Sequence, residues 1–111
     1  MNSPLNPGNG PVRLRCGVVF TRAFVAHLRE FFAEGRGENP GMVPVIGYVK
    51  FAEGRRAGEE WWSLRWENAT AYETEEGIFE EAGVPIGLSK QTRRGLGSKF
   101  VDIEDGKIIV G

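Results

Sequence analysis

Glu60-Trp-Trp-Ser-Leu-Arg-Trp-Glu67 is the stretch of this chain that decides its fold. In an extended strand the side chains alternate between the two faces of the sheet. That alternation divides the stretch into two sets, with Trp62, Leu64 and Trp66 on one face and Trp61, Ser63 and Arg65 on the other. A strand this rich in aromatic residues indicates that the core of a small sheet is built around it.

The segment that precedes this stretch is predicted to be its partner strand. Met42–Ala52 carries apolar side chains on both faces, which is typical of a central strand. Glu53–Gly58 is a polar turn ending in glycine, and such a turn between two strands favours an antiparallel hairpin. We therefore expect the tryptophan stretch to pair directly with Met42–Ala52.

A strand and a helix are predicted before this hairpin. Val12–Phe20 alternates apolar and polar residues, which is the pattern of a half-buried strand. Thr21 is a favourable residue to cap the following helix, and Gly35 is suited to end it. Four phenylalanine and leucine residues at helical spacing give this helix one apolar stripe, namely Phe24, Leu28, Phe31 and Phe32.

The second half of the chain gives weaker signals, apart from its end. We expect a short acidic helix beginning at Thr74 and covering Glu75–Ala82, and a single helical turn from Ser89 to Arg94. Asp105-Gly106 favours a type I′ turn, because both central positions of that turn need positive φ. The resulting hairpin pairs Glu104 with Lys107, Ile103 with Ile108, Asp102 with Ile109 and Val101 with Val110.

These elements together predict an α+β fold. A chain of 111 residues has the length of one domain. We expect residues 1–11, which are rich in proline, asparagine and glycine, to form a flexible arm, and residues 12–111 to form a single α+β domain. Helices and antiparallel strands mix without repeated βαβ units, so we expect one mainly antiparallel sheet of about five strands.

Composition excludes several classes of site. Cys16 is the one cysteine and His27 the one histidine, so a single chain can hold neither a disulfide nor a zinc or iron–sulfur site that needs several of these residues. We expect no cofactor and no metal. The single cysteine favours a cytoplasmic location. No apolar run approaches the roughly 20 residues of a membrane span, and the net charge of −1 gives no overall attraction to nucleic acid.

The sharpest functional indication is Trp61, which the alternation places opposite the core face together with Arg65. If no helix covers that face, an exposed tryptophan beside an arginine is a pairing typical of interaction hot spots. Two charged clusters follow it, one acidic and one basic, comprising Glu73, Glu75, Glu76, Glu80 and Glu81, then Lys90, Arg93, Arg94 and Lys99. Our first hypothesis is a non-enzymatic interaction module that forms a homo-oligomer or binds a protein partner, with Trp61, Arg65, Arg93 and Arg94 as contact residues.

Two alternatives stay open at this point. A nucleic-acid-binding domain would use arginines on the sheet face and in the basic segment 90–99, namely Arg13, Arg15, Arg65, Arg93 and Arg94. A small enzyme would use paired carboxylates from the acidic cluster, or Cys16 and His27 as a nucleophile and its base. Both compete with simpler interpretations, in which the charges are solvated, the cysteine is a core residue and the histidine lies at the core boundary.

Overall fold

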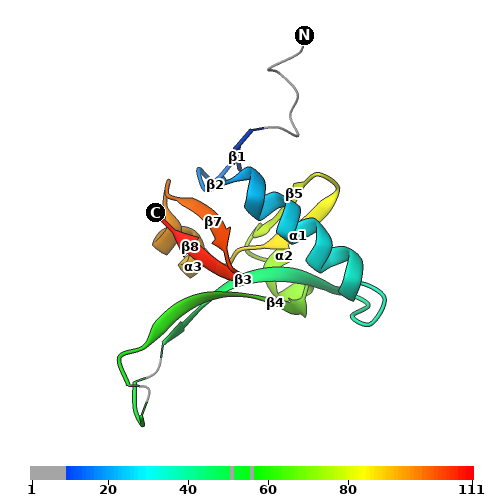
Figure 1. Cartoon of the computed structure of the whole chain (residues 1–111). Helices are drawn as coiled ribbons and strands as arrows, with labels where there is room; N and C mark the ends of the chain where they lie inside the picture. Colours follow the sequence, from blue (N-terminus) through cyan, green and yellow to red (C-terminus); the bar gives the residue numbers. More distant parts are fainter. Residues whose placement is uncertain (1–9, 51, 56) are drawn as a thin grey trace.

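The computed structural model describes residues 10–50, 52–55 and 57–111, and its fold is α+β, as predicted (Figure 1). The described residues form three helices and eight strands. In chain order these are β1 (Val12–Arg13), β2 (Val19–Phe20), α1 (Arg22–Gly35), β3 (Met42–Lys50), β4 (Glu60–Asn68), α2 (Thr70–Glu73), β5 (Ile78–Glu81), β6 (Val84–Gly87), α3 (Lys90–Leu96), β7 (Phe100–Glu104) and β8 (Lys107–Val110). No helix among them is long and apolar enough to cross a membrane.

The strands form two four-stranded sheets, in the orders β1-β2-β7-β8 and β4-β3-β6-β5. Each sheet contains one parallel pairing, of β2 with β7 and of β3 with β6. The remaining pairings are antiparallel, so the mainly antiparallel character expected from the sequence is present in both sheets. The predicted arm at residues 1–11 lies outside the described residues, apart from Gly10 and Pro11.

The tryptophan stretch is strand β4, and its antiparallel pairing with β3 is confirmed. The two strands are in register from Met42 opposite Asn68 to Lys50 opposite Glu60. Leu64 and Trp62 pack against the main core, as the alternation predicts. β4 therefore carries its apolar face toward the centre of the molecule.

Trp66 fixes β4 to helix α1. Its ring stacks on Phe31, with 5.2 Å between the ring centroids, and on Phe32 at 6.0 Å. Gly35, the last residue of α1, lies under the indole so closely that a Cβ atom there would come within 2.6 Å of it. The glycine predicted to end the helix therefore also makes room for the strand.

Helix α1 begins at the predicted cap. The Thr21 hydroxyl accepts the Phe24 N–H at 3.2 Å, which satisfies a backbone donor of the first turn. The same hydroxyl donates to Oδ1 of Asp102 at 2.6 Å, which joins the cap to β7. Hydrogen bonds from Thr21 and from the Ile103 N–H lower the pKa of Asp102. One side chain thus starts the helix and attaches it to the sheet.

The continuous strand predicted over Val12–Phe20 is wrong. The chain folds into the short pair β1 and β2 around a turn at residues 15–17, with Val12 opposite Phe20. Leu14 and Val18 close this turn, since the Leu14 N–H donates to the Val18 carbonyl at 2.8 Å. Gly17 has a φ of +102°, a value that side chains disfavour, so glycine permits the reversal. Alternation alone did not distinguish this tight hairpin from one strand.

The predicted helix over Glu75–Ala82 is also wrong. A short second helix is present, but it is α2 and ends at Glu73, while residues 78–81 form strand β5. β5 pairs with β6 through a turn at Ala82 and Gly83, whose φ values are +55° and +79°. Two adjacent positive φ values match a type I′ hairpin. Pairing with β6, which bridges to β3, overrides the weak helical preference of this segment.

The last predicted elements are confirmed. Ser89 caps α3 by accepting the Thr92 N–H at 3.0 Å, and the helix continues to Leu96, two residues beyond the predicted turn. The β7–β8 hairpin has the predicted register in all four pairs, and Asp105 and Gly106 both have positive φ. The core formed by these elements is one large buried cluster around Phe20, Phe24 and Ile46, with a smaller one beside α2.

Candidate functional site

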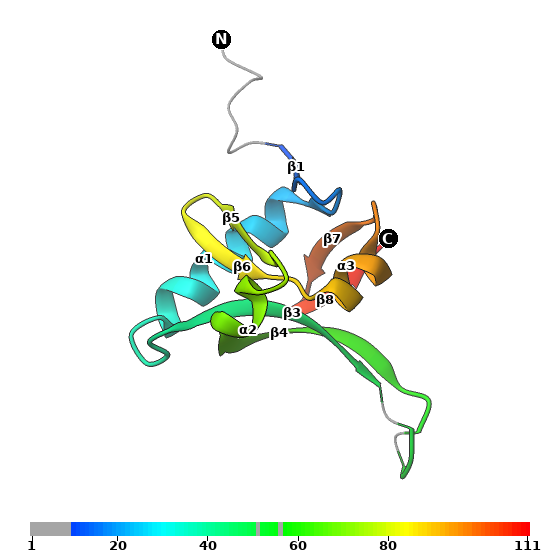
Figure 2. The ribbon, with the colours of Figure 1, turned by 180° about the vertical axis from the view of Figure 1, so that it is seen from behind.

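The β3–β4 hairpin extends beyond the rest of the fold. Both ribbon views show the end of the hairpin at which β3 ends and β4 begins extending beyond the other elements (Figures 1 and 2). Each of its two outer edges borders a cavity among the described residues. The hairpin is therefore the element on which candidate sites converge.

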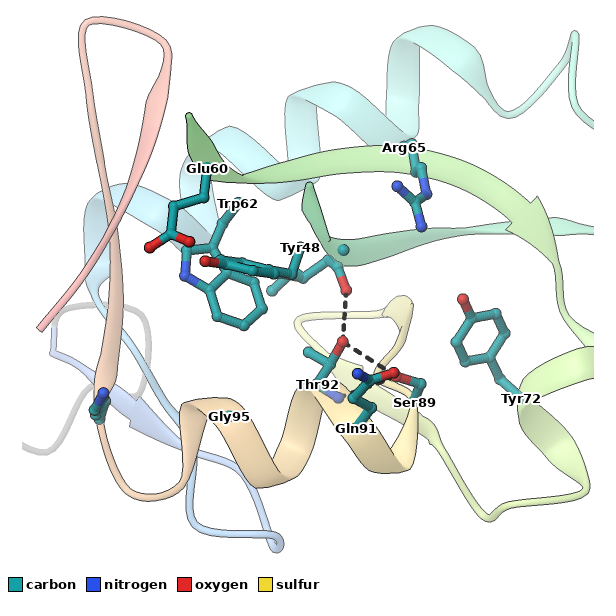
Figure 3. Close-up of a pocket in the computed structure, with 12 residues that line it drawn as sticks. Tyr48, Glu60, Trp62, Arg65, Tyr72, Ser89, Gln91, Thr92 and Gly95 are labelled. Atoms are coloured by element: carbon teal, nitrogen blue, oxygen red, sulfur yellow. Dashed lines mark hydrogen bonds between the residues drawn. The ribbon is translucent and has the colours of Figure 1, made fainter. Parts of the chain in front are cut away.

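The first cavity lies between β3 and α3 and has a volume of about 540 Å³ (Figure 3). Its lining mixes aromatic rings, hydroxyl groups and charges, and consists of Ile46, Gly47, Tyr48, Glu60, Trp62, Arg65, Tyr72, Ser89, Gln91, Thr92, Gly95 and Lys99. Three consecutive β3 residues are in this lining, so the cavity runs along the strand's edge. Its volume is within the range of ligand sites.

The β3 edge is open in this cavity because β6 leaves it early. The β3–β6 pairing consists of a single bridge, of Val45 with Gly87. Immediately after it, the Thr92 hydroxyl donates to the Ile46 carbonyl at 3.4 Å, so α3 supplies the next contact. Beyond Ile46 no described strand pairs with β3 on this side.

The orientation of the free backbone groups follows from this geometry. The Ile46 carbonyl faces α3, whereas the Gly47 carbonyl faces β4, where it accepts the Ser63 hydroxyl at 3.5 Å. The Gly41 carbonyl also faces the β4 side, because it accepts the Ala69 N–H at 3.2 Å. Odd-numbered β3 residues thus bond to β4, and even-numbered ones face outward. The N–H and C=O of Tyr48 therefore point into the cavity.

Two aromatic rings form one end of the cavity. Tyr48 and Trp62 lie opposite each other in the register, with ring centroids 4.9 Å apart. A hydrogen bond to the Glu60 carboxylate raises the pKa of the Tyr48 hydroxyl. Gly95 lets α3 approach Trp62, since a Cβ there would stand 3.4 Å from the indole. Glycine within a helix costs roughly 1 kcal/mol relative to alanine. The close packing of Trp62 on α3 is a physical reason for a glycine at position 95.

A hydrogen-bonded trio forms the other end. Arg65 lies over Gly47, where a Cβ atom would meet its guanidinium at 2.7 Å, and it pairs with Glu67. Tyr72 donates its hydroxyl proton to Glu67 at 2.6 Å. Burial and this carboxylate raise the pKa of Tyr72 to about 12. Burial alone would raise the pKa of Glu67, but the hydrogen bonds from Tyr72 and Arg65 outweigh it and lower that pKa.

The second cavity, of about 600 Å³, borders the outer edge of β4. Its walls come from α1, β4 and the turn of the β7–β8 hairpin, and its lining is His27, Phe31, Trp61, Trp62, Ser63, Leu64, Gly106, Lys107 and Ile108. Trp61 is half-buried there. The structure therefore places Trp61 and Arg65, which the sequence groups together, at two different cavities.

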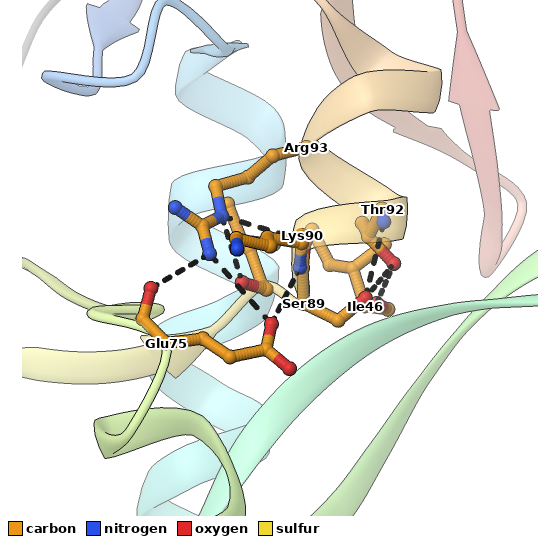
Figure 4. Close-up of polar contacts among 7 residues, drawn as sticks. Ile46, Glu75, Ser89, Lys90, Thr92 and Arg93 are labelled. Atoms are coloured by element: carbon orange, nitrogen blue, oxygen red, sulfur yellow. Dashed lines mark hydrogen bonds and ion pairs between the residues drawn. The ribbon is translucent and has the colours of Figure 1, made fainter.

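Arg93 is held by internal partners (Figure 4). Its guanidinium donates to the carbonyls of Leu88 at 3.1 Å and Glu75 at 2.9 Å, and lies 3.8 Å from the Glu75 carboxylate. Glu75 also accepts the Lys90 N–H at 2.9 Å. The predicted acidic and basic clusters thus meet within one chain at Glu75 and Arg93.

The arginines proposed for nucleic-acid binding come from different elements and most of them have partners within the chain. Arg15 and Arg93 converge on the Phe79 ring, at 4.4 Å and 5.9 Å from its centroid. Arg13 donates to the Gly17 carbonyl at 3.2 Å. Arg65 is paired with Glu67 on another part of the fold, and Arg94 is exposed. Nucleic-acid binding stays a prediction.

Cys16 and His27, the pair considered for nucleophilic catalysis, lie on different elements. Cys16 lies in the β1–β2 turn and packs against the main core, while His27 lines the cavity beside β4. Within the described ranges, no group of three or more histidine, cysteine, aspartate or glutamate residues is placed to hold a metal ion. The sequence missed Tyr48, Tyr72 and Thr92 as cavity residues, because their convergence depends on where β6 and α3 pack.

Comparison of the sequence with models of known protein families gives no match, and comparison with curated proteins gives no significant one.

Proposed function

We propose that this protein is a non-enzymatic interaction module that self-associates through the projecting part of the β3–β4 hairpin. The observation that carries the proposal is that large apolar side chains lie on both faces of this two-stranded ribbon. Tyr48 and Trp62 are paired on one face, and Val49 and Trp61 are opposite each other on the other. The Tyr48 residue is 44% exposed to solvent, although its ring contacts Trp62.

A two-stranded ribbon cannot bury both of its faces within itself. An isolated hairpin is only marginally stable in water, and it usually gains stability when a further layer covers an apolar face. Contiguous exposed apolar surface on a folded chain is typical of interaction sites, and tryptophan and tyrosine are enriched at their energetic centres. A second copy supplies an identical ribbon, so a two-fold contact could cover both with one arrangement.

The single cysteine remains our reason to place the protein in a reducing, cytoplasmic compartment as part of this proposal.

Light scattering at protein concentrations from about 1 µM to about 500 µM tests the proposal. We expect a concentration-dependent dimer for the unmodified chain. Tyr48→Thr and Trp61→Thr should each raise the dissociation constant about tenfold or more, as loss of an aromatic contact at an interface does.

Met42→Thr is the matched control. Met42 lies on the same face of β3 as Tyr48, is exposed to a similar extent, 41% against 44%, and sits at the opposite end of the strand. It should leave association unchanged. A chain that stays monomeric at every concentration would refute the proposal, and so would equal weakening by Met42→Thr and Tyr48→Thr.

A further inference from the structure

We propose that the open edge of β3 binds an extended, acidic peptide segment, which adds to the sheet as a further strand between β3 and α3. This site is distinct from the proposed self-association, because it uses the backbone edge of β3 and not the faces of the ribbon. The occupant is a peptide from a partner, with its own backbone paired to Tyr48.

The first argument is the unmade backbone pairing. The β3–β6 ladder ends at Val45, and the Ile46 carbonyl is satisfied by Thr92. The next outward-facing residue is Tyr48, whose N–H and C=O face the cavity of about 540 Å³. An exposed strand edge with unpaired donors and acceptors is the template on which peptides add as strands.

The second argument is the shape of the opposite wall. Helix α3 runs along the cavity and presents Ser89, Gln91, Thr92 and Gly95 to it (Figure 3). A strand edge facing a helix leaves an elongated groove, in which alternate side chains of an added strand point toward the helix. The aromatic pair Tyr48 and Trp62 at one end gives apolar surface for one such side chain.

The third argument is charge. Three charged side chains line the groove, and two of them have partners: Arg65 pairs with Glu67, and Glu60 bonds to the Tyr48 hydroxyl. Lys99 is exposed and has no ion pair with any residue that the structure describes. Glu60 keeps its negative charge because the Tyr48 hydroxyl is neutral, so the groove carries charges of both signs. Lys99 is the cation of the lining that has no salt bridge among the described residues, and a glutamate or aspartate in the bound segment would pair with it.

Amide hydrogen exchange tests the free edge directly. At a protein concentration where light scattering finds only monomer, the Tyr48 amide should exchange at least about tenfold faster than those of Gly47 and Val49, which bond to β4. If the Tyr48 amide is as protected as its neighbours in the free monomer, the edge is closed and the proposal fails.

Binding is tested with a pool of synthetic peptides, acetyl-X-X-Glu-X-X-amide, in which X is valine, threonine, tyrosine or leucine. At about 1 mM total peptide, the pool should shift the Tyr48 and Thr92 amide resonances and protect the Tyr48 amide from exchange. No shift at these residues refutes the proposal. Equal binding of a backbone N-methylated pool also refutes it, because the groove would then be recognising side chains without strand pairing.

Variants of the protein distinguish the contribution of the Tyr48 backbone to peptide binding from that of its side chain. Tyr48→Pro removes the outward N–H without removing a β4 hydrogen bond, and should weaken binding at least about tenfold. Tyr48→Thr keeps the N–H and loses only the apolar ring, so it should weaken binding less than Tyr48→Pro does, although it also weakens the proposed self-association. Lys99→Glu should reverse the preference, so that a pool with lysine in place of glutamate binds better. Equal affinity of Tyr48→Pro and Tyr48→Thr would overturn strand addition while leaving self-association untouched.

Discussion

Replacing Gly35 by alanine should destabilise the protein, although the same change in a helix usually stabilises it. Gly35 is the last residue of α1. In the middle of a helix alanine is worth about 0.5–1 kcal/mol over glycine, and this range is the upper limit of the gain at a terminal position. A Cβ atom at this position would lie 2.6 Å from Cζ2 of Trp66 and 2.8 Å from Cε2 and Nε1. These distances are too short for any real contact, so the indole or the helix must move.

The magnitude follows from the two opposing effects. Overpacking a well-filled site costs about 1–3 kcal/mol, and Trp66 has little freedom to move because Phe31 and Phe32 stack on it. Subtracting the helical gain leaves a net destabilisation of about 1 kcal/mol. For a domain of this size, that corresponds to a fall in melting temperature of about 4 °C.

Urea denaturation of four variants measures this effect: Gly35→Ala, Gly37→Ala, Trp66→Leu and the double variant Gly35→Ala/Trp66→Leu. Gly37→Ala is the control, because no atom lies within 4 Å of a Cβ there and its backbone φ is not positive, so its effect should be below about 0.5 kcal/mol. In a Trp66→Leu background the clash is relieved, and Gly35→Ala should become neutral or stabilising. A coupling of about 1.5 kcal/mol between Gly35 and Trp66 is expected. If Gly35→Ala stabilises the unmodified chain, the close contact of α1 with β4 is refuted.

Substitutions at three further positions test the hydrogen bonds and close contacts that hold the fold. Thr21→Ala should cost about 1–2 kcal/mol in urea denaturation, with Thr21→Ser near the unmodified value. Because the pKa of Asp102 is lowered, the stabilisation from its hydrogen bond to Thr21 is present above the ordinary carboxyl pKa and lost as the pH falls through the lowered value; a Thr21→Ala variant with unchanged acid sensitivity would contradict this. The raised pKa of Tyr72, about 12 against 10.0, means that its stabilisation is complete below pH 10 and lost as the pH rises toward 12; Tyr72→Phe should remove this alkaline loss, measured as unfolding free energy against pH. Gly77→Ala should cost about 2 kcal/mol or more, since its Cβ would stand 2.5 Å from a backbone carbonyl oxygen; a loss below about 0.5 kcal/mol in urea would show that the backbone yields there.

The elements that could be predicted from the sequence are those specified within a few consecutive residues. Thr21 and Ser89 cap their helices because each side chain bonds to a backbone N–H three residues ahead. Asp105 and Gly106 set the register of the last hairpin because they adopt the positive φ that its turn requires. The apolar face of β4 followed from strand alternation alone.

The incorrect predictions share one physical cause. Residues 78–81 have no strong local preference, and they become a strand because β6 is available to pair with them. Alternation over residues 12–20 is preserved in a tight hairpin, so the pattern did not reveal the turn that Gly17 permits. In both segments the chain reverses at a tight turn that uses positive φ, and the two short strands on either side pair with each other. Hydrophobic spacing does not report such a reversal, so the pattern alone predicted one continuous element.

The candidate sites depend even more on tertiary structure. The sequence by itself determined the aromatic hairpin and, with it, a ribbon carrying apolar side chains on two faces. Only the packing of β6 and α3 decided that the β3 edge is left open after Val45 and that Tyr48 faces a cavity. Packing likewise fixed Arg93 on internal carbonyls and Arg65 on Glu67. A side chain's chemistry is a property of its residue, but its neighbours and the openness of its backbone edge are set by segments far away in the chain.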